Sequence, residues 1–304
     1  MTGGAGFIGA SIVRDLVRRG AEVVVLDSGL SAGFANLDGI DVRVLSADIR
    51  ELDAVRAALE GCAAIVHLAA QASVPGSIAD PLEDAAVNVT GTLGLLDAAR
   101  VAGVRRFVFA SSNAVIGGHP PPANEGLLPY PVSPYGAAKA AIEAYLRAYG
   151  QAYRLEGVAL RFANAYGPWS GHKNSVVAAF IKAYLAGGPL IVRGTGEQTR
   201  DFIHVADVSA MVAACLDAPA ELVASQVFQV GTGHETSLLE LARQLFEAGG
   251  AQVPIQHKAA SPGDVPRNVS DISRAAEALG FAPRVGLAEG LRQTIEWFRD
   301  NWRH

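Results

Sequence analysis

The sequence is poor in cysteine, and this scarcity limits the kinds of protein it can encode. Among its 304 residues only Cys62 and Cys215 are cysteines, and they lie far apart with no CxxC motif. Two such cysteines exclude a disulfide framework and a thiolate zinc site, and they fit a reducing compartment. We therefore expect a cytoplasmic protein that holds no metal and is stabilised by its core.

Long apolar runs and an excess of basic charge are also missing. No hydrophobic stretch reaches the roughly 18 residues that a membrane span needs, and no basic-then-apolar leader precedes the first motif. The formal net charge is −5, which disfavours a general affinity for nucleic acid. Because half of the residues are hydrophobic and only 18% are charged, disorder is excluded. We expect a soluble protein that binds neither membranes nor nucleic acid.

Short β-branched segments alternate with longer amphipathic segments in the first half of the chain. The predicted buried strands are residues 21–26, 42–45, 64–68, 107–110 and 158–160, and the predicted helices are residues 10–19, 52–59, 84–102 and 133–153. Further helices are predicted at 175–186, 205–216, 237–248, 273–278 and 287–299. Strand–helix alternation predicts an α/β fold with a doubly wound parallel (Rossmann) sheet. We assign residues 1–167 to this dinucleotide-binding domain, with about 198–232 returning to it, and 168–304 mainly to a smaller mixed α/β substrate-binding region.

The opening segment lacks a strand that this fold requires. A glycine-rich loop should follow a central strand, yet only Met1 and Thr2 precede it. We expect an empty or stunted central position beside the strand at 21–26, as in a chain that starts a few residues late. The alternative is that another segment fills the gap.

Glycines at positions 3, 6 and 9 form a candidate phosphate-binding loop ahead of an amphipathic helix. Glycine lets the backbone approach a pyrophosphate, and the helix N-terminus offers free N–H groups. Asp27 ends the next strand, where a carboxylate would accept both ribose hydroxyls and repel a 2′-phosphate. The pattern predicts NAD rather than NADP, against the alternatives of a plain tight turn and of an aspartate that only caps a turn.

Two further strand ends carry candidate cofactor contacts. Asp48 and Ile49 follow the strand at 42–45, and residues 67–71 (HLAAQ) end the next one. Ligands bind at the carboxyl ends of such strands. Asp48 has an alternative role as the N-cap of the helix at 52–59. For His67 we expect a place in the core and no chemistry.

Tyr135 and Lys139 carry the predicted chemistry. They are spaced i, i+4 at the start of a helix and so share one face. A tyrosine is a poor base at neutral pH, but an adjacent ammonium and an oxidised nicotinamide would favour its phenolate. Ser111 and Ser112 end the strand at 107–110, which lets a hydroxyl point into the same cleft.

These motifs together resemble one protein family. The segments that carry the resemblance are TGGAGFIG at 2–9, Asp27, Asp48-Ile49, HLAAQASV at 67–74, NVTGT at 88–92, SSNAVIG at 111–117, SPYGAAK at 133–139, LRFANAYGP at 160–168, QTRDFIHVAD at 198–207 and PGDV at 262–265. The chain resembles the extended short-chain dehydrogenase/reductases, and among them NAD-dependent epimerases and dehydratases similar to UDP-glucose 4-epimerase. The resemblance covers nearly the whole chain.

The resemblance implies roles for individual residues. It makes Tyr135 the acid/base, Lys139 its partner that also binds the nicotinamide ribose, and Ser112 the hydroxyl that holds the reacting oxygen. The implied cofactor-binding set is Gly3, Gly6, Phe7, Ile8, Gly9, Asp27, Asp48, Ile49, Leu68, Ala69, Ala70, Asn88, Tyr135 and Lys139. The implied substrate-binding set is Ser112, Asn164, Val177, Arg200 and Asp264, with residues 175–180 and 190–193 around the uracil. Asn164 has an alternative role as a turn amide, and Arg200 as the partner of Asp201 in a surface ion pair.

Departures from the family pattern narrow the expected reaction. Asn113 and Ala114 stand where dehydratases carry an Asp-Glu pair, so water elimination lacks its acid and base. Ser261 replaces an arginine that grips the diphosphate, and Asn268 stands where a tyrosine can restrict the sugar pocket. We expect inversion at C4 of UDP-glucose, UDP-galactose or their N-acetyl forms.

Three further expectations complete the sequence-based interpretation. The nearest alternative activity is that of a UDP-glucuronate 4-epimerase or decarboxylase, or of another NAD-linked sugar-nucleotide oxidoreductase. A rival of another class is an idle NAD-binding regulator. By resemblance, the segments at 84–102 and 133–153 should pair two copies into a homodimer.

Overall fold

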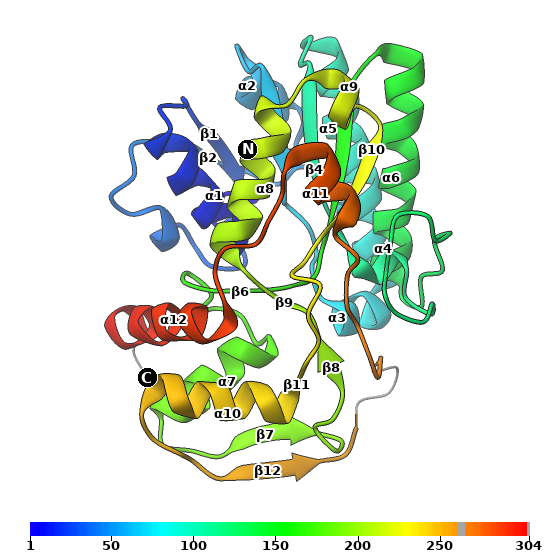
Figure 1. Cartoon of the computed structure of the whole chain (residues 1–304). Coiled ribbons are helices and arrows are strands. Elements are labelled where there is room, and N and C mark those ends of the chain that lie inside the picture. Colours follow the sequence, from blue (N-terminus) through cyan, green and yellow to red (C-terminus); the bar gives the residue numbers. More distant parts are fainter. Residues whose placement is uncertain (261–264, 303–304) are drawn as a thin grey trace.

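The chain forms a large parallel-sheet region and a smaller region beneath it (Figure 1). The structure, a computed structural model, describes residues 1–260 and 265–302. One ladder of the main sheet has the order β10-β5-β4-β3, and β1 pairs with β2 in a second ladder. The strands are β1 Val24–Asp27, β2 Arg43–Ser46, β3 Ala64–His67, β4 Arg106–Ser112, β5 Glu156–Phe162 and β10 Gln226–Val230. All these pairings are parallel, which confirms the predicted α/β class.

Of the residues that the structure describes, only Met1 and Thr2 occupy the position between β1 and β3. Leu26 N–H donates to Met1 O at 2.8 Å, and Thr2 N–H donates to Val66 O at 3.0 Å. Thr2 forms isolated parallel bridges to Leu26 and His67, and these bridges join the two ladders. The expected stunted central position is therefore present. Neighbouring side chains close the space beneath it to a void of about 10 Å³.

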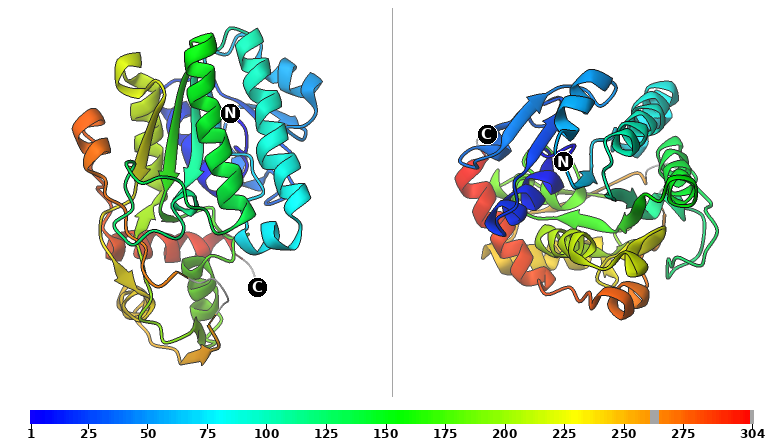
Figure 2. Two further views of the ribbon diagram at one scale, coloured as in Figure 1. Left: turned by 90° about the vertical axis from the view of Figure 1, so that its right-hand side faces the viewer. Right: turned by 90° about the horizontal axis from the view of Figure 1, so that it is seen from above.

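Helices cover both faces of the main sheet. The first face carries α1 Phe7–Arg18 and α8 Val205–Asp217, and the second carries α2 Leu52–Leu59, α5 Thr92–Val101 and α6 Pro134–Tyr153. Figure 2 shows α5 and α6 side by side on that second face. Central strands have apolar side chains on both faces, because each face packs against helices. Phe107 and Phe109 of β4 pack towards α5 and α6, whereas Val108 packs towards α1 and α8.

Two sequence-based predictions about this sheet are wrong. The pattern predicts a buried strand at residues 42–45, but three of the four residues of β2 are exposed, because β2 is an edge strand paired only with β1 among the described residues. The helix predicted at 84–102 is interrupted. It consists of α4 Pro81–Ala85, a π-helical segment Ala86–Gly91, and α5.

The smaller region is built on a parallel pair of strands, β7 Leu190–Arg193 and β12 Ile255–Lys258. Its core lies between this pair and three helices, α7 Val176–Leu185, α10 Leu238–Gly249 and α12 Leu287–Asn301. Short elements connect the two regions: β6 Asn164–Tyr166, β8 Thr199–Arg200, β9 Phe202–His204 and β11 Thr236–Ser237. The strand β10 returns to the main sheet beside β5, within the stretch expected to do so. The proposed boundary at 167 stays a prediction.

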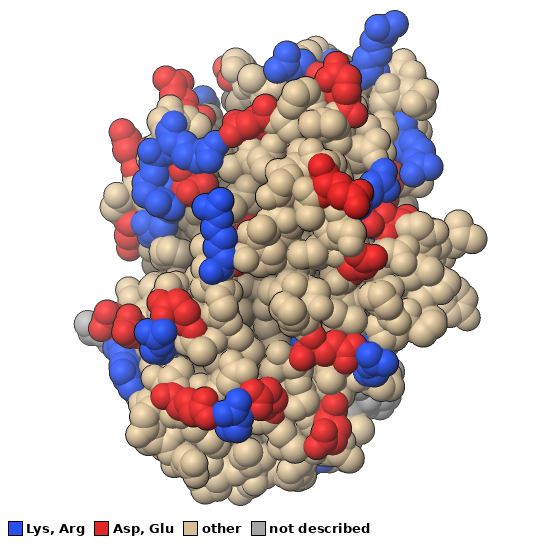
Figure 3. All heavy atoms as spheres, viewed as in Figure 1, with Lys and Arg blue, Asp and Glu red and all other residues tan. Residues whose placement is uncertain are grey.

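The remaining helical elements are short. They are α3 Val74–Ala79, α9 Ala220–Val223, α11 Ser273–Leu279 and two 3₁₀ turns, Ala35–Leu37 and Asn113–Val115. No helix in the described part of the chain is long and apolar enough to cross a membrane. On the face in Figure 3, acidic and basic side chains are intermixed.

Candidate active site

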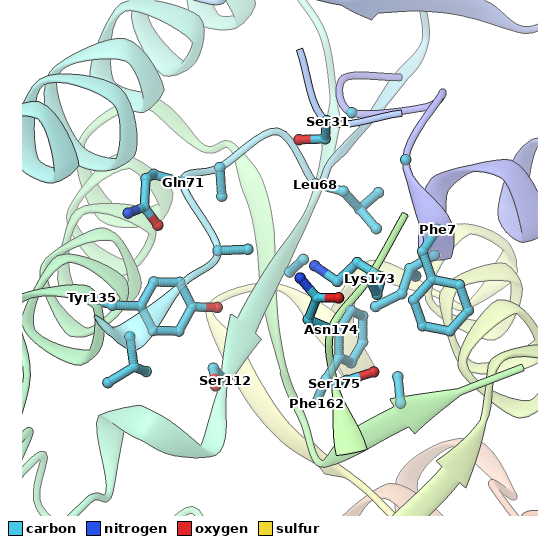
Figure 4. Close-up of a pocket in the computed structure, with 18 of the residues that line it drawn as sticks. Phe7, Ser31, Leu68, Gln71, Ser112, Tyr135, Phe162, Lys173, Asn174 and Ser175 are labelled. Carbon is cyan, nitrogen blue, oxygen red and sulfur yellow. The ribbon is translucent and has the colours of Figure 1, made fainter. Parts of the chain in front are cut away.

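A cavity of about 1310 Å³ lies between the carboxyl ends of the main-sheet strands and the smaller region. It contains most of the residues singled out in the sequence. Those that line it are Gly3, Gly6, Phe7, Ile8, Gly9, Asp27, Asp48, Ile49, Leu68, Ala69, Ala70, Ser112, Tyr135, Lys139, Asn164, Val177 and Arg200. Figure 4 shows Tyr135 and Ser112 on one side of this space and Phe7 on the other. One cavity therefore joins the predicted cofactor loop to the predicted catalytic residues.

The glycine loop packs so closely against its own backbone and the segment after β3 that side chains at Gly3 and Gly9 would not fit. Gly3 has φ +69°, and a Cβ on Gly9 would lie 2.0 Å from the carbonyl oxygen of Gly3. The first helical hydrogen bond runs from Ala10 N–H to Gly6 O, so the N–H groups of Phe7 and Ile8 precede the bonded ladder of α1. These groups and the helix dipole suit a pyrophosphate. The loop therefore fits the phosphates of NAD.

Asp27 has a structural task as well as a place in the cavity. Its Oδ2 accepts a hydrogen bond from Ala5 N–H at 2.9 Å, and its Oδ1 accepts one from Gly29 N–H at 2.9 Å. The carboxylate thus braces the glycine loop and its own turn. Each oxygen has a second lone pair that remains available for a ribose hydroxyl.

Asp48 does not cap the following helix. The N-cap of α2 is Glu51, while the carboxylate of Asp48 accepts hydrogen bonds from Arg50 Nε at 2.9 Å and from Arg50 Nη2 at 2.8 Å. These bonds hold the pKa of Asp48 below its usual value. The alternative role as an N-cap is therefore wrong, and Asp48 lines the cavity as part of an ion pair.

Two residues of the sequence-based interpretation lie behind the cavity wall. Asn88 is buried and does not line the cavity. Its side chain holds the backbone of Gln71 with two 2.9 Å hydrogen bonds and donates to Asp84 at 2.9 Å. Asn88 therefore supports the segment after β3, which periodicity could not predict. His67 is a buried core residue, as expected, and bonds to Thr2 and Thr92.

The strand end β4 and the start of α6 bring Ser112, Tyr135 and Lys139 together. The helix begins after Ser133, whose Oγ accepts a hydrogen bond from Gly136 N–H at 3.2 Å. A Cβ at Gly136 would lie 2.4 Å from the carbonyl oxygen of Ala114. Only glycine therefore lets α6 pack this closely against the turn after Ser112.

Lys139 is buried, and its ammonium is hydrogen-bonded to the backbone of β4. Its Nζ donates to Ala110 O at 2.8 Å and lies 5.6 Å from the centre of the Tyr135 ring. Burial lowers the pKa of Lys139 to about 8, although Asp84 and Glu143 act in the opposite direction. Even so, most Lys139 side chains carry a proton at neutral pH.

Tyr135 is held in its phenol form in this structure. Burial raises its pKa to about 12, against the smaller lowering effect of a hydrogen bond with Ser112. The sequence-based interpretation expected the Lys139 ammonium to favour the phenolate, but in this structure burial keeps the pKa of Tyr135 high. A positive charge placed beside the phenol would lower this pKa.

A buried ion pair beneath these residues was not among the sequence-based predictions. Glu143, one turn after Lys139, accepts hydrogen bonds from Arg161 Nε at 2.9 Å and Arg161 Nη2 at 2.7 Å. It also accepts one from Ser111 Oγ at 2.5 Å. The pair ties α6 to β4 and β5. Glu143 and Arg161 lie on different elements, so no local spacing in the sequence pointed to this pair.

Arg200 lines the cavity together with Asn164 and Val177. Its Nη1 donates to Thr199 O at 2.8 Å and Val265 O at 2.7 Å. Asp201 is fully buried and accepts hydrogen bonds from Thr232. It is therefore not at the surface, and the alternative of a surface ion pair with Arg200 is wrong. Asp264 and Ser261 lie outside the described residues.

Asn113, which follows Ser112, forms hydrogen bonds with Asn268 and Ser270. Asn113 Nδ2 donates to Asn268 Oδ1 at 3.1 Å and to Ser270 Oγ at 2.9 Å. Asn268, expected near the sugar pocket, is not among the described residues that line the cavity. Its side chain fixes Asn113 instead.

Comparison with known proteins gives the family. The model of the NAD dependent epimerase/dehydratase family matches residues 1–231. The chain belongs to this family. Its cofactor is therefore NAD, as the glycine loop predicted.

The similarity to known enzymes covers the whole chain. The UDP-glucose 4-epimerase of Mycolicibacterium smegmatis is 40% identical over 99% of this chain and 98% of its own length. The solved UDP-glucose 4-epimerase of Thermus thermophilus, a complex with NAD, has a TM-score of 0.90 and 39% identity over 99% and 98% of the two chains. That of Thermotoga maritima, with UDP-glucose, has a TM-score of 0.93 and 35% identity over 99% and 98%. Other relatives include epimerases of UDP-N-acetylglucosamine and UDP-glucuronic acid and dTDP-glucose 4,6-dehydratases.

Proposed function

We propose that this protein inverts the configuration at C4 of a UDP-sugar, namely UDP-glucose, UDP-galactose or their N-acetyl forms. The observation that carries the proposal is the shared cavity. Ser112, Tyr135 and Lys139 face the same space as the glycine loop, and Arg200 and Asn164 line its far part. The similarity to UDP-glucose 4-epimerases over the full chain supports this choice.

The proton chemistry falls to three side chains. Bound NAD supplies reversible hydride transfer at C4. Tyr135 accepts the proton of the C4 hydroxyl and later returns it, while Ser112 donates a hydrogen bond to the same oxygen. Lys139 binds the nicotinamide ribose and adds positive charge beside Tyr135, which stabilises the phenolate.

Inversion requires the sugar to present both faces to the same catalytic residues. Arg200 and Asn164 would hold the diphosphate, because a guanidinium fork suits phosphate oxygens. The sugar is then free to turn about its diphosphate linkage as a 4-keto sugar. Val177, buried at the start of α7, would contact the uracil.

The segment after Ser112 favours epimerisation over dehydration. A dehydratase needs an acid and a base next to the catalytic hydroxyl, but here the positions are Asn113 and Ala114. The Asn113 amide is engaged by Asn268 and Ser270. Neither side chain offers a carboxylate for removing water.

A panel of UDP-sugars tests the proposal. The protein is incubated with UDP-glucose, UDP-galactose, their N-acetyl forms and UDP-glucuronate, and the C4 epimers are separated. We expect interconversion within the first four. Turnover of UDP-glucuronate alone, with or without release of CO₂, would replace the proposal by the alternative enzyme. Bound NAD without turnover of any sugar would instead favour an idle regulator.

We also propose a homodimer through α4, α5 and α6. Large apolar side chains are exposed on these helices, notably Leu82 at 82%, Val101 at 71% and Tyr153 at 53% exposure. Exposed apolar surface of this kind marks interaction sites. Sedimentation equilibrium of the wild type and of a Val101→Glu variant tests the proposal, and a monomeric wild type would refute it.

A further inference from the structure

Lys173 is a buried-stem lysine in the cavity that no sequence motif singled out. It lies on the loop 167–175 between β6 and α7, and its side chain lines the cavity. Figure 4 shows it in the space between Phe7 of the glycine loop and Asn174, with its amine directed into the cavity. It is thus placed between the cofactor side and the substrate side.

The backbone of Lys173 is held on both sides, so its position in the cavity is not that of a free surface lysine. Its N–H donates to Ser170 O at 2.9 Å, and its carbonyl oxygen accepts from Lys182 Nζ at 2.8 Å. The same loop is tied to the cofactor region, because Asn36 Nδ2 donates both to Trp169 O at 3.3 Å and to Ala5 O at 3.0 Å.

The charge of Lys173 has no anionic partner among the described residues. No hydrogen bond or ion pair joins its Nζ to any group in residues 1–260 and 265–302. Burial lowers its pKa, and no carboxylate acts against that effect. A ligand that brings negative charge into the cavity can therefore pair with this ammonium.

Two other cations that line the cavity are already engaged by protein groups. Among the lining residues Arg50 is paired with Asp48 and Glu83, and Lys139 donates to Ala110 O. Both ligands proposed for this cavity contain a diphosphate: NAD, and the UDP of the sugar nucleotide.

We propose that Lys173 binds a diphosphate in this cavity, as a point charge that complements the N–H groups of the glycine loop or the guanidinium of Arg200. An ammonium on a flexible stem suits this task because it binds phosphate without a fixed geometry. That NAD is a ligand of this cavity follows from the family, whereas that UDP is a ligand rests on the proposed function.

The test replaces Lys173 by Met, which keeps the stem and removes the charge, and by Arg, which keeps the charge. Lys258→Met is the matched control, since Lys258 lines the same cavity but is exposed. The dissociation constants of NAD and of UDP are measured by calorimetry, with adenosine and uridine as comparison ligands that lack phosphates.

We expect Lys173→Met to raise the dissociation constant of NAD or of UDP by about tenfold or more, as for the loss of one charge-assisted hydrogen bond. The binding of adenosine and uridine should be unaffected, and Lys173→Arg should retain most of the affinity for the diphosphate ligand. High salt should reduce the difference in affinity between the wild type and Lys173→Met. The affected ligand identifies which diphosphate Lys173 binds. The inference is overturned if Lys173→Met binds both ligands within about twofold of Lys258→Met. Failure of the wild type to bind UDP would instead contradict the proposed function, and the NAD measurement would still decide the role of Lys173.

Discussion

Replacing Glu143 by leucine should destabilise the protein far more than breaking a surface ion pair. Glu143 and Arg161 have side-chain exposures of 7% and 4%. The substitution removes two hydrogen bonds to Arg161 and one to Ser111. Nη1 of Arg161 already has no partner among the described residues. The variant would therefore bury a guanidinium that has lost its charge partner.

The cost of such a break is about 3–5 kcal/mol, because an unpaired buried charge has neither water nor a counter-ion. That is a large share of a typical stability of about 5–15 kcal/mol. Urea unfolding followed by circular dichroism measures it as a lower midpoint. The control is Asp15→Leu, which breaks the surface pair with Arg18 and should cost at most about 1 kcal/mol.

A double variant separates the ion pair from simple packing. Glu143→Leu with Arg161→Leu replaces both charges by apolar groups, so it should recover much of the loss. The reasoning about the buried charge is wrong if Glu143→Leu is no more destabilising than Asp15→Leu. It is also wrong if the double variant loses as much free energy of unfolding as Glu143→Leu and Arg161→Leu lose in sum.

Three further predictions concern the site itself. Tyr135→Phe should retain NAD but lower turnover at least about a hundredfold, as expected for a general acid/base, and near-wild-type epimerisation would contradict its role. Asp27→Ala should relax the preference for NAD over NADP, because it removes the ribose acceptors and the repulsion of a 2′-phosphate; equal discrimination in binding assays would leave Asp27 as a turn residue only. Lys139→Met should abolish turnover yet stabilise the ligand-free protein, by on the order of 1–3 kcal/mol, since burial lowers the pKa of Lys139 from 10.5 to about 8. The gain in stability should be full below pH 8, where Lys139 is protonated in both the folded and the unfolded wild type. It should shrink as the pH rises towards 10.5, because the lysine then loses its proton in both states. A difference in urea midpoint between variant and wild type that does not depend on pH would refute this prediction.

Features with a repeating pattern were predictable from the sequence. The central strands were recognised because both of their faces are buried, which gives continuous apolar runs such as those of β4 and β5. The glycine loop and the Tyr135–Lys139 spacing were recognised because backbone approach and helical geometry each restrict residue type. The family model and the solved relatives confirm the fold and the NAD dependence that followed from these patterns.

Features that depend on three-dimensional packing were not predictable. Val44 is exposed on the edge strand β2, and an apolar run in the sequence does not reveal which strand lies at an edge. The π-helical segment at 86–91 contains Asn88, which hydrogen-bonds to Asp84 and to the distant Gln71. Lys173 lies in a loop without periodicity, and only the folding of that loop over the cavity brings its charge to the site.

The bridge at Thr2 has a mechanical consequence. Within residues 1–260 and 265–302, backbone hydrogen bonds join the ladder of β1 and β2 to the ladder from β3 to β10 only along Met1 to Gly3, so the sheet contains a narrow seam. The glycine loop and Asp27 lie at this seam, whereas Ser112 ends β4 of the other ladder and Tyr135 lies on α6. A dinucleotide bound along the cavity would span it and fasten one ladder to the other. Amide hydrogen exchange in β1 and β2 should then slow more on addition of NAD than exchange in β4 and β5, which are already braced by helices on both faces.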